Sequence, residues 1–291
     1  MLPSFTSLNR RQFLRRSAAA TVFTGAAAGI YTWRWEPHWI EVVERPLAVR
    51  DLPPALSGAR VMQISDLHVG PVVDETYIMS AMERVAAMRP DAILVTGDFM
   101  TCRGVEQVER TLHVVAHLQP RQTPIFAIMG NHDYGHGWRN AEAANQLANG
   151  MEALGVSVLR NCAADFRGLQ IAGCDDWWAD RCDVPGTIAQ LDEGRAAIFL
   201  CHNPDVVDVP VWSGYKGWIL AGHTHGGQCC VPGYGPLILP IYNPRYAAGE
   251  VTLTGGRTLY VNRGLGYKHR VRFFCRPEIT LFHLQSANGY A

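Results

Sequence analysis

The sequence is organised around the run GHTHGGQ at residues 222–228, which places His223 and His225 one residue apart among glycines. Glycine lets the backbone approach a site closely and take positive φ, and imidazole nitrogen binds most divalent transition metals. In an extended loop this spacing is too tight for both rings to face one ion, and it suits two neighbouring ions. Alone the run is weak support for a metal site, because loop histidines also bond to backbone. Matching carboxylates elsewhere in the chain are needed.

Short apolar runs predict five buried strands, at 60–65, 92–96, 125–129, 197–200 and 217–220. Helical periodicity lies between the first runs, at 74–88, 105–118 and 141–154. Further strands are expected at 39–49, 156–159, 169–172, 251–253, 259–261 and 279–282, and a short helix at 188–193. The β-rich second half favours two stacked sheets flanked by helices over one doubly wound sheet.

Each of the five apolar runs ends at residues that can bind a metal ion. They are Asp66, His68, Asp98, Asn131, His202, His223 and His225, with His132 beside them. In α/β sheets ligands bind at the carboxyl ends of the strands, so these side chains are expected at one place. They combine imidazoles, two carboxylates and an amide oxygen. This mixture holds two dications without quenching their Lewis acidity. Asp98 is the candidate bridge between the ions.

The ordered motifs resemble those of the calcineurin-like metallophosphoesterases. They are Asp66-x-His68, Gly97-Asp98, Gly130-Asn131-His132-Asp133, His202 and Gly222-His223-x-His225. All five are present over residues 65–228, which is most of the chain. The fuller strings SDLHVG (65–70), CHNPD (201–205) and GHTHGGQ, with NRGLG (262–266), resemble a narrower branch. That branch contains membrane-associated or twin-arginine-exported phosphodiesterases and is similar to one type of UDP-2,3-diacylglucosamine pyrophosphatase.

The resemblance implies a four-layer αββα sandwich of two mixed β-sheets flanked by helices. It also implies a dinuclear site in which Asp66, His68 and His225 hold one divalent ion, Asn131, His202 and His223 hold the other, and Asp98 bridges. Hydroxide activated by the two ions would attack phosphorus in line. His132 would stabilise the phosphoryl oxygens or protonate the leaving oxygen, and Asp133 would orient His132 through a hydrogen bond. The metals could be Mn, Fe, Zn or Co, since nitrogen and oxygen ligands accept each of them.

Two departures from related families bear on the substrate. Thr101 stands where purple acid phosphatases carry a tyrosine, so no iron–tyrosinate chromophore is expected. Arg103 could mimic the arginine of the family's phosphoserine phosphatases, which leaves monoester hydrolysis open. The substrate pocket has further candidate residues. Four tryptophans either line the pocket or belong to the core: Trp138, Trp177, Trp178 and Trp212. Two arginines, Arg245 and Arg263, either clamp a second phosphate or pair at the surface, and His136 is a further candidate for the pocket.

The first 35 residues are expected to be a twin-arginine signal peptide or membrane anchor, followed by one catalytic domain at 36–291. Residues 9–15, NRRQFLR, resemble the export motif. The apolar run at 17–30 is short for a membrane span, which needs about 20 residues. Cleavage near residues 26–28 and retention as an anchor extending to Trp33 are both open. Export through the twin-arginine translocase would deliver the protein to the periplasm or to the outer face of the inner membrane.

Charge and cysteine content limit the partners. Lys plus Arg equals Asp plus Glu, so no long nucleic acid is expected. Eight cysteines in an exported chain could form disulfides, with Cys174 and Cys182 a candidate pair, or could be small buried groups.

These observations predict a dinuclear metallophosphoesterase, most simply a phosphodiesterase of the envelope or membrane. Its substrate would be a phosphodiester or pyrophosphate that is linked to a lipid or a nucleotide. The alternatives are a UDP-diacylglucosamine-type pyrophosphatase of lipid A synthesis, an intracellular nuclease or nucleotide phosphodiesterase and, in a different class, a catalytically silent binding scaffold. The net charge and the twin-arginine motif disfavour the intracellular alternative.

Overall fold

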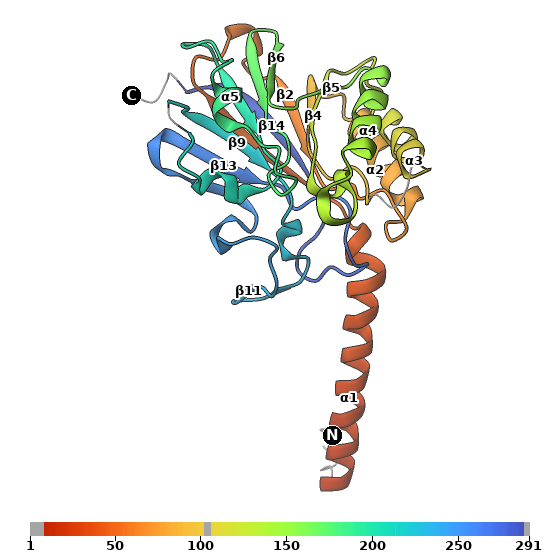
Figure 1. The fold of residues 1–291 in the computed structure, drawn as a ribbon. Coiled ribbons are helices and arrows are strands. Elements are labelled where there is room, and N and C mark those ends of the chain that lie inside the picture. The colour runs from red at the N-terminus through yellow and green to blue at the C-terminus, as the bar shows by residue number, and fades with distance from the viewer. Residues whose placement is uncertain (1–8, 102–105, 213, 288–291) are drawn as a thin grey trace.

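The computed structural model describes residues 9–101, 106–212 and 214–287. Two six-stranded mixed sheets are stacked, with long helices on the outer face of the first (Figure 1). The expected two-sheet sandwich is therefore confirmed. On the outer face of the second sheet the covering layer is thinner, because it consists of the short helix α5 (Val184–Ile188), short 3-10 turns and loops.

The first sheet has the order β1-β14-β2-β3-β4-β5. Its strands are β1 (Glu41–Val49), β14 (Glu278–Ser286), β2 (Arg60–Ile64), β3 (Ala92–Thr96), β4 (Ile125–Ile128) and β5 (Ser157–Val158). Strands β2 to β5 are parallel, whereas β14 runs antiparallel to β2 and parallel to β1. The last long strand of the chain thus lies between the first two.

The second sheet has the order β12-β13-β9-β8-β7-β6. Its strands are β12 (Gly249–Thr252), β13 (Arg257–Val261), β9 (Gly217–Ala221), β8 (Ala197–Leu200), β7 (Leu169–Gly173) and β6 (Cys162–Phe166). The four central strands are parallel, and the two edge strands are antiparallel to their neighbours. A small separate hairpin, β10 (Cys230–Val231) and β11 (Gly235–Pro236), follows the 222–228 run.

Three helices cover the first sheet because each has one apolar face. They are α2 (Glu75–Ala87), α3 (Glu106–Ala116) and α4 (Ala141–Leu154). In α2 the buried side chains follow the helical repeat, and the Asp74 carboxylate caps the first turn by accepting the Tyr77 N–H at 3.2 Å. Helix α4 begins after the Asn140 cap and ends at Gly155, whose φ of 103° closes the helix. The helical periods of the sequence were sufficient to place all three.

One expected element is wrong. A helix was expected at 188–193, but α5 covers Val184–Ile188 instead. Pro185 occupies the first turn, where its missing N–H is not needed, and the Asp183 side chain accepts the Gly186 N–H. The helix therefore starts earlier than its apolar residues suggested. Strand β6 and the hairpin were not predicted, because neither carries a continuous apolar run.

Helix α1 (Arg10–Ile30) projects from the domain and buries none of its side chains (Figure 1). It continues through turns at Tyr31–Trp35 and Glu36–His38. These turns contact the domain, since Arg272 N–H donates to the Thr32 carbonyl at 3.0 Å and the buried Glu36 carboxylate accepts the Cys275 N–H. Among the described residues no helix has the length and apolar character needed to cross a membrane.

Candidate metal centre

Five strands deliver the candidate ligands to one edge of the sandwich. Asp66 and His68 follow β2, Asp98 follows β3 and Asn131 follows β4, all in the first sheet. His202 follows β8 and His223 and His225 follow β9, in the second sheet. All seven are buried. The site is thus formed where the carboxyl ends of strands from both sheets meet.

The backbone at these positions is bent out of strand geometry. Five of the seven have positive φ: 54° at Asp66, 50° at His68, 54° at Asp98, 72° at His223 and 51° at His225. Residues other than glycine seldom take such angles, and they persist where surrounding structure holds them. The bends turn side chains that would otherwise follow the strands toward a common point.

A first cluster consists of Asp66, His68 and His225. The two Nε2 atoms of the histidines lie 3.0 Å apart, and Asp66 Oδ1 lies 3.4 Å from His225 Nε2 and 4.0 Å from His68 Nε2. Burial lowers the pKa of His68 to about 3 and that of His225 well below its ordinary range. Two neutral imidazoles and a carboxylate that converge in this way fit one divalent cation.

A second cluster consists of Asp98, His202 and His223. Asp98 Oδ2 lies 3.2 Å from His202 Nε2, and His223 Nδ1 lies 3.3 Å from the same nitrogen. Asp98 Oδ2 is also 3.5 Å from His68 Nε2 of the first cluster. The Asp98 carboxylate therefore reaches both clusters.

The electrostatics of the second cluster favour positive charge. Burial opposes ionisation of Asp98, but His202, His132 and His68 outweigh it and hold the Asp98 pKa well below its usual range. Burial likewise lowers the pKa of His202, but the Asp98 carboxylate outweighs it and raises that pKa to about 10. The Asp98 carboxylate thus favours positive charge beside His202, whereas burial lowers the pKa of His223 to about 3.

Neighbouring acceptors fix the orientation of the rings. His202 Nδ1 donates to the Thr96 carbonyl at 2.7 Å, and His223 Nε2 donates to the Pro240 carbonyl at 3.0 Å. His68 Nδ1 shares a hydrogen bond of 3.0 Å with the Thr101 hydroxyl. Because a carbonyl can only accept, the other nitrogen of His202 and of His223 is directed into the cluster, as in metal-binding histidines.

Asn131 is fully buried, and among the described residues neither its Oδ1 nor its Nδ2 has a hydrogen-bond partner. A buried amide without partners is costly, so such a group usually faces a ligand or an ion. Its place after β4, beside the loop after β3 that carries Asp98, fits an oxygen ligand for the second ion.

His132 lies at the opening of the site. Its ring is 4.9 Å from the His68 ring and lines a cavity of about 830 Å³ together with Thr101, His136 and Trp138. Its backbone N–H donates to Asp98 Oδ1 at 2.8 Å. Burial lowers the pKa of the ring, although Asp98 opposes this.

Asp133 has different partners from those expected. Its Oδ2 accepts the Gly130 N–H at 2.8 Å and its Oδ1 accepts the Met100 N–H at 3.0 Å. The carboxylate thus accepts from the backbone of two loops, and the expected hydrogen bond to the His132 ring is not among the hydrogen bonds of the described residues. Asp133 instead ties the loop after β3 to the loop after β4.

Two of the four tryptophans stand beside the site. The Trp178 ring is 4.4 Å from that of His223 and perpendicular to it, and Trp138 is 4.5 Å from Trp178. Trp212 instead belongs to the core, where its Nε1 donates to the Val206 carbonyl. Trp177 packs against the same core.

Of the two alternatives for the arginines, a phosphate clamp or pairing with acidic residues, Arg263 shows pairing. Arg263 is held by ion pairs with Glu41 and Glu278, and Arg245 is exposed in the turn Pro244–Tyr246. Arg103 lies outside the described residues. The cysteines that the structure describes are free, Cys174 and Cys182 included.

Sequence reasoning missed a further acidic pair, Asp175 and Asp176, directly after β7. Asp176 is buried, its Oδ2 has no partner among the described residues, and burial raises its pKa to about 7 while His202 opposes that rise. Asp175 accepts hydrogen bonds from the Tyr134 hydroxyl and from Arg160 Nε. The rule that identified the other ligands applies here too, since β7 is also an apolar run that ends in polar residues.

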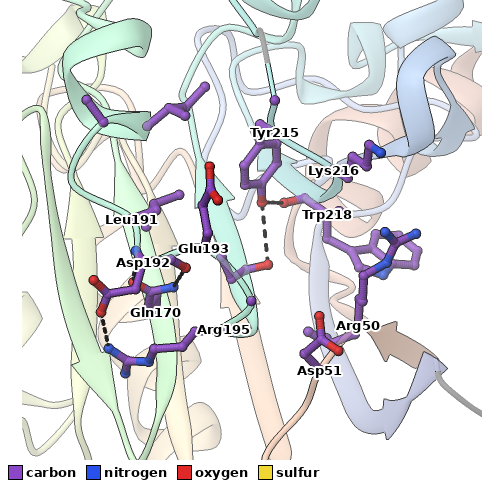
Figure 2. Close-up of a pocket in the computed structure, with 17 residues that line it drawn as sticks. Arg50, Asp51, Gln170, Leu191, Asp192, Glu193, Arg195, Tyr215, Lys216 and Trp218 are labelled. Atoms are coloured by element: carbon purple, nitrogen blue, oxygen red, sulfur yellow. Dashed lines mark hydrogen bonds and ion pairs between the residues drawn. The ribbon is translucent and has the colours of Figure 1, made fainter.

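A separate cavity of about 480 Å³ opens at the other ends of the strands, where β7, β8 and β9 begin (Figure 2). Some of its polar groups are bonded to one another: Gln170 exchanges hydrogen bonds with the backbone of Asp192, and the Tyr215 hydroxyl donates to the Trp218 carbonyl. This cavity contains none of the candidate ligands.

Comparisons with known proteins agree with the geometry. The family model described as calcineurin-like phosphoesterase matches residues 59–227. The chain is 33% identical to the uncharacterized metallophosphoesterase YkuE of Bacillus subtilis, covering 97% of this chain and 99% of that one. It is 31% identical to the phosphodiesterase YaeI of Escherichia coli, covering 95% and 99%. It is 28% identical to the UDP-2,3-diacylglucosamine pyrophosphatase LpxG of Chlamydia trachomatis, covering 92% and 98%.

Among solved structures, a purple acid phosphatase from yellow lupin matches with a TM-score of 0.44 and 14% identity. The match covers 72% of this chain and 45% of that one, so this chain spans less than half of its length.

Proposed function

This chain belongs to the calcineurin-like phosphoesterase family, and from that premise we propose that it hydrolyses a phosphodiester or pyrophosphate carried by an envelope or membrane component. It is a metallophosphoesterase with two buried groups of candidate metal ligands. The observation that carries the proposal is the pair of clusters joined by one carboxylate, Asp98.

The proposed ligands follow from that geometry. Asp66, His68 and His225 would hold one ion, Asn131, His202 and His223 would hold the other, and Asp98 would bind both. Two divalent ions bound there supply Lewis acidity to the phosphoryl group and to the attacking water. Manganese, iron, zinc and cobalt all suit these nitrogen and oxygen donors.

His132 is the proposed acid or electrostatic partner. Its ring lies between the first cluster and the cavity, and its backbone N–H is fixed on Asp98. From there it can donate a hydrogen bond to a phosphoryl oxygen or a proton to the leaving oxygen. Asp133 supports this arrangement indirectly, by holding the loops at Met100 and Gly130.

The substrate class is proposed from the surroundings of the site. Trp138 and Trp178 beside His223 offer flat apolar faces for a base or an acyl chain. The relatives' names include a phosphodiesterase and a pyrophosphatase of a diacylated nucleotide sugar. Zero net charge gives no general attraction for long nucleic acids.

We also propose export through the twin-arginine translocase, to the periplasm or to the outer face of the inner membrane. The support is the motif at residues 9–15 within an exposed N-terminal helix. A reporter fused to residues 1–35 would test it. Export that is lost when Arg10 and Arg11 become lysines is expected, and cytoplasmic retention of the unchanged fusion would overturn it.

The activity is tested with a generic aryl phosphodiester. Hydrolysis by the Mn²⁺-loaded protein should disappear with chelator and should fall by about 100-fold or more in Asp98→Ala. Asp192→Ala, which removes an exposed carboxylate, should retain activity. A panel of lipid-linked and nucleotide-linked phosphodiesters and pyrophosphates then identifies the substrate class. Lack of hydrolysis of every member, with two ions bound, would favour a silent binding scaffold.

A further inference from the structure

The exposed apolar side chains are concentrated in a few segments of the chain. Among the large hydrophobic residues that the structure describes as exposed, all but Val72 lie in residues 13–39, in residues 231–242 or at Phe274. We call the exposed residues of 231–242 together with Phe274 the apolar rim. It consists of Val231, Tyr234, Leu237, Ile238, Tyr242 and Phe274. The exposed fractions reach 78% at Tyr234, 79% at Ile238 and 85% at Tyr242.

The loop that carries most of the rim has no charged residue from 229 to 244. Monomeric soluble domains seldom leave so large an apolar surface uncovered, and such surfaces usually contact a partner or a membrane. We therefore expect the apolar rim to be covered by a partner or by a lipid surface.

The rim is held in position by the candidate metal centre. The Pro240 carbonyl of this loop accepts the hydrogen bond from His223 Nε2, and Tyr242 N–H donates to Asp205 Oδ2 at 2.7 Å. On the other side Cys230 N–H donates to the Phe273 carbonyl at 2.8 Å. With its backbone fixed in this way, the loop keeps its apolar side chains turned outward and next to the site.

Basic residues adjoin the rim. Residues 264–277 contain no acidic residue and include Lys268, Arg270 and Arg276, which are at least partly exposed, whereas Arg272 is buried. The first 35 residues contain five arginines and no acidic residue. The two segments touch, because Arg270 lies over the Trp33 ring at 5.4 Å and the Arg272 N–H donates to the Thr32 carbonyl at 3.0 Å. Figure 1 shows α1 and the β11 hairpin leaving the domain from the same end.

This combination fits a lipid surface better than a second copy of the chain. Exposed Tyr and Trp side chains favour the boundary between headgroups and acyl chains, and basic residues attract anionic lipids. A symmetric dimer through the rim would instead bring the same basic segments together, which costs electrostatic energy.

We propose that the apolar rim inserts into the surface of an anionic lipid bilayer and holds the opening of the metal centre against it. Docking itself is independent of hydrolysis. The proposal rests on the proposed function in one respect only: it takes the substrate in the bilayer to be a phosphoester carried by a lipid.

The test uses the full chain, wild type and the double variant Tyr234→Asp/Ile238→Asp, whose side chains are exposed. Sedimentation with phosphatidylcholine–phosphatidylglycerol vesicles should show at least a tenfold weaker affinity for the variant, because two charges enter the acyl boundary. Binding of wild type should weaken on phosphatidylcholine alone. The control Ala189→Asp/Thr252→Asp adds the same charges at exposed positions outside the rim and should bind like wild type.

Hydrolysis of the water-soluble aryl phosphodiester is measured in parallel. It should stay within about twofold of wild type in the rim variant, while hydrolysis of a vesicle-borne phosphodiester should fall about tenfold. Equal vesicle binding by wild type and rim variant overturns the proposal, since α1 alone would then account for attachment. A wild-type dimer that the rim variant abolishes also overturns it, in favour of a second copy. Vesicle binding that depends on the rim without any hydrolysis leaves docking intact and removes the proposed function.

Discussion

Glycines beside the candidate ligands leave no space for a side chain. A Cβ on Gly130 would lie 2.3 Å from both the backbone nitrogen and Oδ1 of Asp98, and a Cβ on Gly222 would lie 1.9 Å from Ser65 Oγ. Contacts this short with backbone or fixed side chains force a displacement. At the residue scale, the geometry of the ligands therefore depends on residues that bind nothing themselves.

Gly130→Ala should displace Asp98 and reduce the metal content together with phosphodiesterase activity. A shift of about 1 Å in such a group costs on the order of 100-fold in rate. Metal content after dialysis and kcat/KM for a soluble phosphodiester are the measurements. Gly29→Ala in α1, where nothing lies within 4 Å, is the neutral control. Two bound ions and full activity in Gly130→Ala would contradict the role assigned to Asp98.

Asp176→Asn should weaken binding of one ion by about tenfold with little change in fold, because it removes a buried negative charge that acts on His202. Calorimetric metal titration measures this. The neighbouring Asp175→Asn is the matched control: its carboxylate holds Tyr134 and Arg160, so it should lose about 1–3 kcal/mol of unfolding free energy and keep metal affinity. Equal losses of metal affinity in Asp176→Asn and Asp175→Asn would show that Asp176 has no specific effect on the metal site.

At the scale of elements, the loops after β3 and β4 are joined through one side chain, Asp133. Asp133→Asn replaces one acceptor oxygen by a donor that faces an N–H group, so it should lower the unfolding free energy by about 1–3 kcal/mol. Urea denaturation measures that loss. Because no orienting bond to His132 is involved, Asp133→Asn and His132→Asn should reduce kcat independently. A double variant no slower than His132→Asn alone would restore the orienting role.

Most strands and the three long helices could be predicted because local pattern decides them. Strands β3 and β4 are apolar runs with both faces buried, and β2 is mostly apolar and buried. Helix α4 has the expected bounds because its cap and closing glycine are local signals. The place of β14 between β1 and β2 could not be predicted, since pairing over such a separation leaves no local pattern.

The site followed a similar division. Its candidate ligands were recognisable because they follow apolar strands. The positive φ angles that bring them together could not be predicted, because Asp and His take such angles only where surrounding structure holds them. The carbonyls of Thr96 and Pro240 that orient His202 and His223 are backbone groups, which no side-chain motif records. Asp176 was missed although the strand-end rule covers it.

At the scale of the whole molecule, bound ions should contribute to stability. Each cluster buries carboxylate and imidazole groups, and ligands that bind only the folded state stabilise it by about 2.7 kcal/mol at 100 times their dissociation constant. Chelation should therefore lower the thermal midpoint by about 5–10 °C for a chain of this size. Scanning calorimetry with and without chelator measures the shift. Asp98→Ala should show a smaller one, and an unchanged midpoint in wild type would speak against tightly held ions.

The position of β14 has a consequence for synthesis on the ribosome. Strand β2 ends at Ile64 and its partner β14 begins at Glu278, so every candidate ligand emerges before the strand that completes the first sheet. Until then β1 and β2 lack β14, the strand that hydrogen-bonds to both of them. Their free edges can therefore pair with other strands. The nascent chain should consequently need protection by chaperones until translation reaches residue 286. We therefore expect metal loading to follow completion of the first sheet.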